Sequence, residues 1–249
     1  MSQNSPLEIS RWLLSALRTR LFLYYEDRIP QEGPVLVVSN HRSFMDAPVL
    51  MTALNRPVRF ACHHYMGQVP VMREIVTGQL GCFPLELPEH RQQDFFQQAI
   101  RLLQTSQVVG VFPEGTEPMV RFTPPNQIGE FQRGFAHLAL RSRSLFEGES
   151  SVRGLTLLPV AIASLEEVST SAVPLKLLSF FDPSEPLFNQ GGLHPLVIYR
   201  RIAVLIGRPY WITPQQREQY QGKQAKTVVA DLTNHCQTEI ANLLRQGCY

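Results

Sequence analysis

The chain has 249 residues, of which 44% are hydrophobic and 18% charged, so it can bury a large core and is not disordered by composition. Its formal net charge of +2 is too small to indicate nucleic-acid binding. The four cysteines form no CxxC pair, which argues against a zinc site or a disulfide framework and favours a reducing compartment. We expect neither a signal peptide nor a membrane-spanning helix, since no apolar run approaches the roughly 20 residues of a span.

The first expected element is a helix over Leu7–Tyr25, with apolar residues on one face. That face consists of Leu13, Leu14, Leu17, Leu21 and Tyr24. Arginines and Trp12 lie off it, so the helix either faces a core or lies among lipid headgroups. Because Pro30 and Gly33-Pro34 break the chain, we divide it into an amphipathic segment, residues 1–30, and a main domain, residues 31–249.

Strand-like and helix-like runs alternate through the rest of the chain. Strands are expected at Pro34–Val38, Val58–Cys62, Leu80–Leu85, Gln107–Phe112, Leu155–Ala163, Leu175–Phe180 and Ile202–Ile206. Helices are expected at Ala47–Leu54, Asp94–Gln104, Phe131–Arg143 and Gln224–Arg245. The Pro- and Gly-rich stretch Asp182–Pro195 is expected to be a surface loop. This alternation predicts an α/β fold, with a single mixed or largely parallel sheet flanked by helices.

Polar residues with possible chemistry follow the first buried strand, in the run Asn40–Asp46. His41 is able to take a proton from a hydroxyl near neutral pH, and Asp46 is able to orient its ring. On a continuous helix these two side chains would diverge by roughly 140°. They meet only if His41 lies in the strand-to-helix turn, for which Ser43 would be the N-cap. On spacing alone, a surface or capping pair is the simpler interpretation.

A second strand-to-loop transition occurs at Phe112–Thr116. Gly115 allows backbone N–H groups to approach a ligand closely. Glu114 either receives a substrate hydroxyl or orders the loop. Taken by itself, the block is more typical of a simple turn with a solvated carboxylate.

The blocks in combination resemble the glycerolipid acyltransferase family, whose best-known members acylate lysophosphatidic acid. They occur in the family's order between Pro34 and Pro209, which is most of the chain. The matching blocks are His41 and Asp46 with four residues between them, Phe112–Thr116, Phe131–Gly134, Leu157–Ile162 and Ile206–Pro209.

The resemblance implies that residues 31–249 form an acyltransferase domain with His41 as the general base and Asp46 as its orienting carboxylate. An acceptor hydroxyl would attack an acyl thioester of coenzyme A or acyl carrier protein, without a covalent enzyme intermediate. Neither a metal nor a cofactor is needed, because a thioester is already activated. The loop Glu114, Gly115 and Thr116 would position the acceptor, and Pro159 would contribute to the acyl or donor site.

Two positions depart from the family pattern. An arginine usually follows the Glu-Gly-Thr block and another closes the motif near residue 85, whereas this chain has Glu117 and Leu87. Arginine is the preferred forked ligand of phosphate, so the usual phosphate clamp is missing. If the acceptor is 1-acylglycerol-3-phosphate, other arginines must bind its phosphate. The candidates are Arg42, Arg59, Arg91, Arg121 and Arg133.

Two alternatives stay open. In the first alternative, the acceptor is a lipid without a phosphate, such as a glycolipid, a pigment or another lipid alcohol. In the other alternative, the protein is a catalytically inactive scaffold that binds membranes. The resemblance also favours a lipid-surface role for Leu7–Tyr25, so we expect a peripheral or monotopic protein on the cytoplasmic face of a membrane.

Overall fold

The computed structural model describes residues 5–62, 73–85, 91–115, 123–125, 127–141, 154–174, 176 and 193–247. The strands are β1 (Arg20–Tyr24), β2 (Val35–Ser39), β3 (Val58–Cys62), β4 (Phe83–Pro84), β5 (Val108–Val111), β6 (Thr156–Pro174), β7 (Leu193–Ile206) and β8 (Tyr210–Trp211). The α-helices are α1 (Pro6–Ala16), α2 (Asp46–Leu54), α5 (Arg91–Gln104), α7 (Gly134–Arg141), α9 (Pro214–Gln221) and α10 (Ala225–Gly247). A 3₁₀ turn, η1 (Glu26–Arg28), and a π-helical segment, η2 (Arg73–Gln79), complete the elements.

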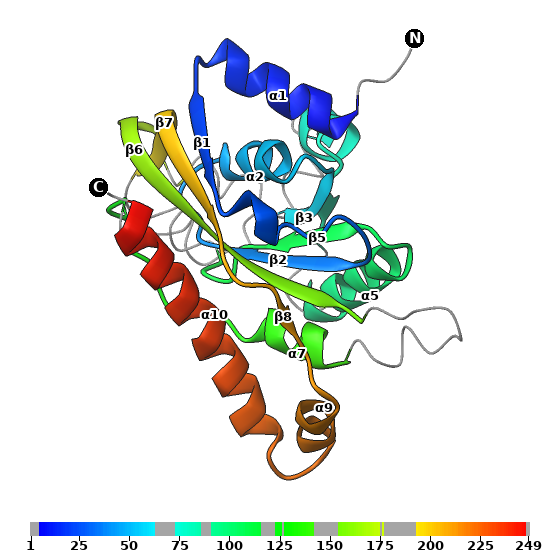
Figure 1. Ribbon diagram of the computed structural model, residues 1–249. Helices are drawn as coiled ribbons and strands as arrows, with labels where there is room; N and C mark the ends of the chain where they lie inside the picture. The colour runs from blue at the N-terminus through cyan, green and yellow to red at the C-terminus, as the bar shows by residue number, and fades with distance from the viewer. Residues whose placement is uncertain are drawn as a thin grey trace.

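The strands form one mixed sheet in the order β1-β7-β6-β2-β5-β3-β4, with β8 paired to the start of β6 (Figure 1). Strands β6, β2, β5, β3 and β4 are parallel to one another, and β1 is parallel to β7. Strand β7 is antiparallel to β6. The parallel strands β2 and β5 therefore end at the same edge of the sheet, where α/β proteins place their sites. The expected single-domain α/β fold is confirmed.

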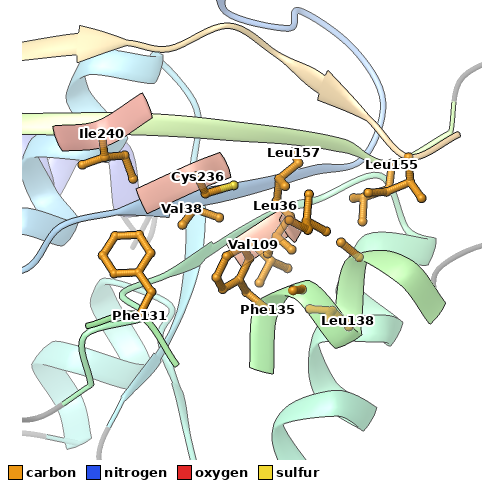
Figure 2. Packing of buried hydrophobic residues seen from close by; sticks show 14 of the residues in the cluster. Leu36, Val38, Val109, Phe131, Phe135, Leu138, Leu155, Leu157, Cys236 and Ile240 are labelled. Atoms are coloured by element: carbon orange, nitrogen blue, oxygen red, sulfur yellow. The ribbon is translucent and has the colours of Figure 1, made fainter. Parts of the chain in front are cut away.

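Alternate side chains of the central strands enter two separate cores. Val35 and Val37 pack with α1 and α2, whereas Leu36 and Val38 pack with α5, α7 and α10. Figure 1 shows α1 and α2 on one side of the sheet and α10 crossing the other. Figure 2 shows the second core, where Leu36 and Val109 from the sheet lie beside Phe135 of α7. Burial on both faces explains why the sequence of β2 is apolar throughout.

The helix expected over Leu7–Tyr25 is wrong in its second half. Helix α1 begins with a capping box between Ser5 and Glu8 and ends at Ala16, and Arg18 then takes a left-handed conformation with φ 55°. Residues Arg20–Tyr24 form β1, which pairs with β7. Its alternating leucines fit a strand as well as a helix, and hydrogen bonding to β7 decides between them. The division at residue 30 stays a prediction.

Strands β6 and β7 are much longer than the expected Leu155–Ala163 and Ile202–Ile206. Their outer halves pair with each other and form a hairpin arm, residues 164–174 and 193–201, that continues beyond the apolar sheet. The β6 part of the arm carries Ser, Thr and Glu among its apolar residues, and the β7 part contains Pro195 and the arginines at 200 and 201, so neither part continues the apolar run of its inner half. The expected loop Asp182–Pro195 is wrong at its end, because β7 begins at Leu193. The expected strand Leu175–Phe180 lies outside the described residues except for Lys176, which is helical.

Candidate active site

His41 and Asp46 meet in the turn between β2 and α2. Nδ1 of His41 lies 2.8 Å from Oδ2 of Asp46. Ser43 is not the N-cap of the helix, contrary to expectation, because α2 begins at Asp46. Its hydroxyl instead donates to the Val197 carbonyl at 2.6 Å and accepts from the Met45 N–H at 3.1 Å. The turn thus replaces the first helical turn and lets residues five apart in sequence face each other.

The carboxylate of Asp46 organises this turn. Its Oδ2 accepts hydrogen bonds from the backbone N–H groups of Arg42, at 2.7 Å, and Ser43, at 2.8 Å. Its Oδ1 accepts one from the Tyr199 hydroxyl at 2.8 Å. Only 1% of the Asp46 side chain is exposed, so these donors replace the water that a buried carboxylate loses. An ionised carboxylate only accepts hydrogen bonds, which places the imidazole proton of His41 on Nδ1.

The ring of His41 packs with one face against aromatic side chains. Phe112 lies parallel to it with centroids 4.2 Å apart, and Phe60 lies against Phe112 at 4.9 Å. The His41 side chain is 16% exposed. Within the described part of the chain, its Nε2 makes no hydrogen bond. The imidazole is therefore fixed in plane and tautomer, with its basic nitrogen available to a ligand.

Glu114 ties the end of β5 to the His41 turn. One carboxylate oxygen accepts from the His41 N–H at 2.9 Å, and the other accepts from the Gly129 N–H at 2.6 Å. Burial raises the pKa of Glu114, and the hydrogen bonds from Gly129 and His41 oppose that shift. Gly115 has φ +70°, and its N–H closes a turn onto the Phe112 carbonyl at 3.1 Å. Of the two roles expected for Glu114, the ordering of loops is visible in these contacts.

Asn40 marks the point where β2 gives way to the turn. Its side-chain amide donates to the Ile162 carbonyl at 3.0 Å and accepts from the Ile162 N–H at 2.8 Å. The side chain thereby continues the pairing of β2 with β6 for one more step while the backbone turns away. His41 follows directly, so its position is fixed relative to β6.

The candidate phosphate-binding arginines have different surroundings. Arg42 is 4% exposed, and its guanidinium makes a forked ion pair with Glu167 at 2.8 and 2.9 Å. Its Nε also donates to the Thr123 carbonyl at 2.8 Å. Arg59 donates to the Gln107 side chain and to the Gly81 carbonyl, each at 3.1 Å. Arg133 is exposed before α7.

Several expected site residues lie outside what the structure describes. They are Thr116, Glu117, Arg121, Leu87 and the side chain of Arg91. Pro159 is buried inside the sheet, where it pairs with Val38 of β2 and its carbonyl accepts from the Gly207 N–H at 2.8 Å. The role expected for Pro159 in acyl or donor binding stays a prediction.

Among the described residues that contact the His41–Asp46 turn, sequence reasoning gave no role to Tyr199, Glu167 and Phe112. Phe112 is the first residue of the recognised block Phe112–Thr116, so its place in that block was a usable signal. Tyr199 and Glu167 carry no local signal, because they reach the turn only through the hairpin arm. In the described residues, no group of three His, Cys, Asp or Glu side chains is placed to hold a metal ion. No described helix is both long and apolar enough to cross a membrane.

The fold and the site together define an α/β protein with a histidine–aspartate pair directly after a central parallel strand. The family model described as Acyltransferase matches residues 20–163, more than half of the chain. The chain therefore belongs to the acyltransferase family, and the resemblance found in its motifs is confirmed.

Among solved structures, the chain is similar to the 1-acyl-sn-glycerophosphate (LPA) acyltransferase PlsC from Thermotoga maritima, with a TM-score of 0.60. The likeness covers 97% of this chain and 77% of that one, at 14% sequence identity. At this identity it shows a shared fold. The comparison with curated proteins finds no match.

Proposed function

We propose that this protein is an O-acyltransferase that moves a fatty acyl group from an acyl thioester to the hydroxyl of a lipid, with His41 as the general base. The observation that carries the proposal is the 2.8 Å contact between His41 Nδ1 and Asp46 Oδ2, which leaves Nε2 as the basic nitrogen. Membership of the acyltransferase family supports the reaction class.

The chemistry requires one base and no covalent enzyme intermediate. Nε2 of His41 accepts the proton of the acceptor hydroxyl while the hydroxyl oxygen forms a bond to the thioester carbonyl carbon. The carbonyl electron pair moves onto its oxygen. When the carbonyl re-forms, the C–S bond breaks, and the departing thiolate takes the proton from the imidazolium. Asp46 keeps Nδ1 protonated and stabilises the positive charge in between.

We propose 1-acylglycerol-3-phosphate as the acceptor, with acyl carrier protein or coenzyme A carrying the acyl group. The ion pair with Glu167 makes Arg42 a poor phosphate ligand, since moving it would leave a partly buried carboxylate without its cation. Exposed Arg133 is a better candidate among the described residues, and Arg121 is the candidate from the sequence that follows Thr116. A neutral lipid alcohol is the competing acceptor class, because Glu117 and Leu87 replace the family's arginines.

A panel of acyl-transfer assays tests both the reaction and the acceptor. Purified protein is given acyl-coenzyme A or acyl carrier protein thioesters together with lysophosphatidate or an uncharged lyso-lipid. We expect turnover of lysophosphatidate that falls when Arg121 or Arg133 is replaced by Gln. Turnover of the uncharged acceptor alone would overturn the acceptor assignment. If His41→Ala retained the full biological effect of the protein, the inactive scaffold would be the better description.

We further propose that α1 contacts a lipid surface. Its apolar stripe is engaged in the protein, because Leu14 is buried and Leu7 and Leu17 pack against the core beside α2. The lipid contact is therefore assigned to the outer face, where Trp12 is 69% exposed and Arg11 is also exposed.

Co-sedimentation with anionic liposomes tests this membrane contact. Trp12→Ser is expected to reduce the bound fraction severalfold without unfolding the domain. Trp211→Ser is the matched control, because Trp211 is 57% exposed on β8, at the end of the sheet far from α1 (Figure 1). Equal binding by the two variants and the unaltered protein would contradict a role for α1.

A further inference from the structure

The hydroxyl of Tyr199 is the partner that Asp46 has outside its own turn. Of the four hydrogen bonds that the described residues make with this carboxylate, three come from residues 41–43 and converge on Oδ2. The fourth, from Tyr199 in β7, is 2.8 Å long and goes to Oδ1. A carboxylate held at one oxygen is still able to rotate about its Cβ–Cγ bond, whereas donors at both oxygens fix its plane.

Tyr199 itself is held firmly. Its side chain is among the largest that are fully buried, at 1% exposure. Its backbone N–H donates to the Met45 sulfur at 3.3 Å, and its carbonyl accepts from the Thr19 hydroxyl at 2.8 Å. Burial raises the pKa of Tyr199 well above its ordinary value, and the charge of Asp46 raises it further. The phenol is therefore protonated at neutral pH and donates to Asp46.

The residue that pairs with Tyr199 across the hairpin arm holds the turn between β2 and α2 at a second point. Tyr199 of β7 lies opposite Glu167 of β6 in the antiparallel pair. Glu167 binds the guanidinium of Arg42, while Tyr199 binds Asp46. Side chains directly opposite each other in an antiparallel pair share a face, so one rung reaches both charged groups of the turn. The backbone of the arm adds the Val197 carbonyl, which accepts from Ser43 at 2.6 Å.

We propose that Tyr199 is a positioning residue for acyl transfer: its hydroxyl fixes the Asp46 carboxylate so that Oδ2 faces Nδ1 of His41. This inference rests on the proposed function for its catalytic consequence, and on the hydrogen-bond geometry alone for its effect on the histidine–aspartate pair. Tyr199 touches no reacting atom and acts through Asp46.

Loss of the Tyr199 hydroxyl changes the surroundings of the Asp46 carboxylate. In Tyr199→Phe, Oδ1 of Asp46 is left buried without a donor, so its negative charge is less dispersed and attracts a proton more strongly. Other charged groups also face His41 and Asp46. They are Glu114, which follows β5, and Arg42 with its partner Glu167 in the hairpin arm. These groups keep their contacts in the variant, so any change measured at His41 reports the change at Asp46.

The first measurement does not depend on acyl transfer. Histidine ring resonances are followed by NMR across pH, with the His41 signals assigned by their loss in His41→Gln. We expect the His41 midpoint in Tyr199→Phe to move upward by about half a unit to one unit. Tyr220→Phe is the matched control, because the Tyr220 hydroxyl binds His137 and Arg141 instead. An unchanged His41 midpoint would overturn the proposal.

The second measurement is the kinetic profile. For Tyr199→Phe, we expect kcat to fall about tenfold with KM nearly unchanged, and the acidic limb of kcat/KM to shift upward like the NMR midpoint. In an Asp46→Ala background, the same substitution is expected to have no further effect on kcat. An equal fall in both backgrounds, or a loss matched by unfolding in circular dichroism, would make Tyr199 merely structural.

The two experiments separate this inference from the proposed function. If the unaltered protein turned over no acyl thioester with any acceptor while the NMR midpoint still moved in Tyr199→Phe, the proposed function would fail and the positioning of the pair would stand. If turnover were robust but neither the midpoint nor the pH profile moved, the proposed function would stand and the role of Tyr199 would fall.

Discussion

The parallel half of the sheet and the antiparallel hairpin arm supply different parts of the site. Strands β2 and β5 end side by side and deliver His41 and Glu114, each within a recognisable motif. The arm of β6 and β7 delivers Glu167 and Tyr199, which belong to no motif. The comparison teaches that the proposed base and its direct partners come from the ends of parallel strands, whereas a distant hairpin adds further contacts that hold their turn in place.

The strongest test of this comparison replaces the base itself. His41→Gln removes the proton acceptor but keeps a side chain of similar polarity, and we expect acyl transfer to fall by about 10²–10⁴-fold. His235→Gln is the control, since His235 is an exposed residue of α10. Steady-state rates with the best acceptor measure both variants. A His41→Gln protein with nearly full activity would end the assignment of His41 as base.

The next largest effect is expected on the parallel side, at Glu114. In Glu114→Gln, the amide keeps one acceptor oxygen but turns an NH₂ group toward the N–H of His41 or of Gly129. Loss of a charge-assisted hydrogen bond at this position should lower kcat/KM by about 10–100-fold. Glu130→Gln, at an exposed position nearby, is the control. Equal kinetics for the two variants would show that the Glu114 contacts do not position His41.

On the arm side, the Arg42–Glu167 ion pair predicts a pH-dependent stability. Burial opposes ionisation of Glu167, yet the hydrogen bonds and charge of Arg42 hold its pKa below the ordinary 4.5. A lowered carboxyl pKa contributes stability above the unfolded-state pKa, and this stability is lost as the pH falls through the folded-state value.

Thermal or urea unfolding of Glu167→Gln measures this contribution. We expect a loss of about 2 kcal/mol in the free energy of unfolding at pH 7, because a hydrogen-bonded charge is removed. The difference from the unaltered protein should shrink below pH 4.5, the ordinary carboxyl pKa from which Glu167 is shifted downward. Glu166→Gln is the matched control, since Glu166 is its exposed neighbour. A pH-independent difference would show that the charge of Glu167 is not what stabilises the arm.

The smallest effect is expected from the ring that lies against His41. Phe112→Leu keeps an apolar contact but loses the parallel stacking, which is worth about 0.5–1.5 kcal/mol. We expect kcat to fall by roughly three- to tenfold, because the imidazole gains freedom to tilt. Phe95→Leu is the control, since Phe95 stacks on Phe83. Identical rates for the two variants would show that hydrogen bonding alone orients His41.

Much of the parallel half could be predicted because its signals are local. The apolar run of β2, the strand Val58–Cys62 and the periodicity of α5 each state their structure within a few residues. His41 and Asp46 were found for the same reason, since both belong to one short motif. The N-terminal segment shows the limit of such signals, because the leucines of Arg20–Tyr24 fit a helix and a strand equally well.

By itself, the sequence determined the α/β class, the family and the pair His41 and Asp46, because short-range patterns encode all three. The tertiary structure alone decided that Arg20–Tyr24 joins the sheet, that Ser43 caps no helix and that Tyr199 reaches Asp46. The physical reason is that hydrogen bonding between distant strands selects among conformations that local patterns leave nearly equal in energy. The sequence around residue 46 and the sequence around residue 199 do not indicate that the two residues touch. Their contact depends on the pairing of β7 with β6.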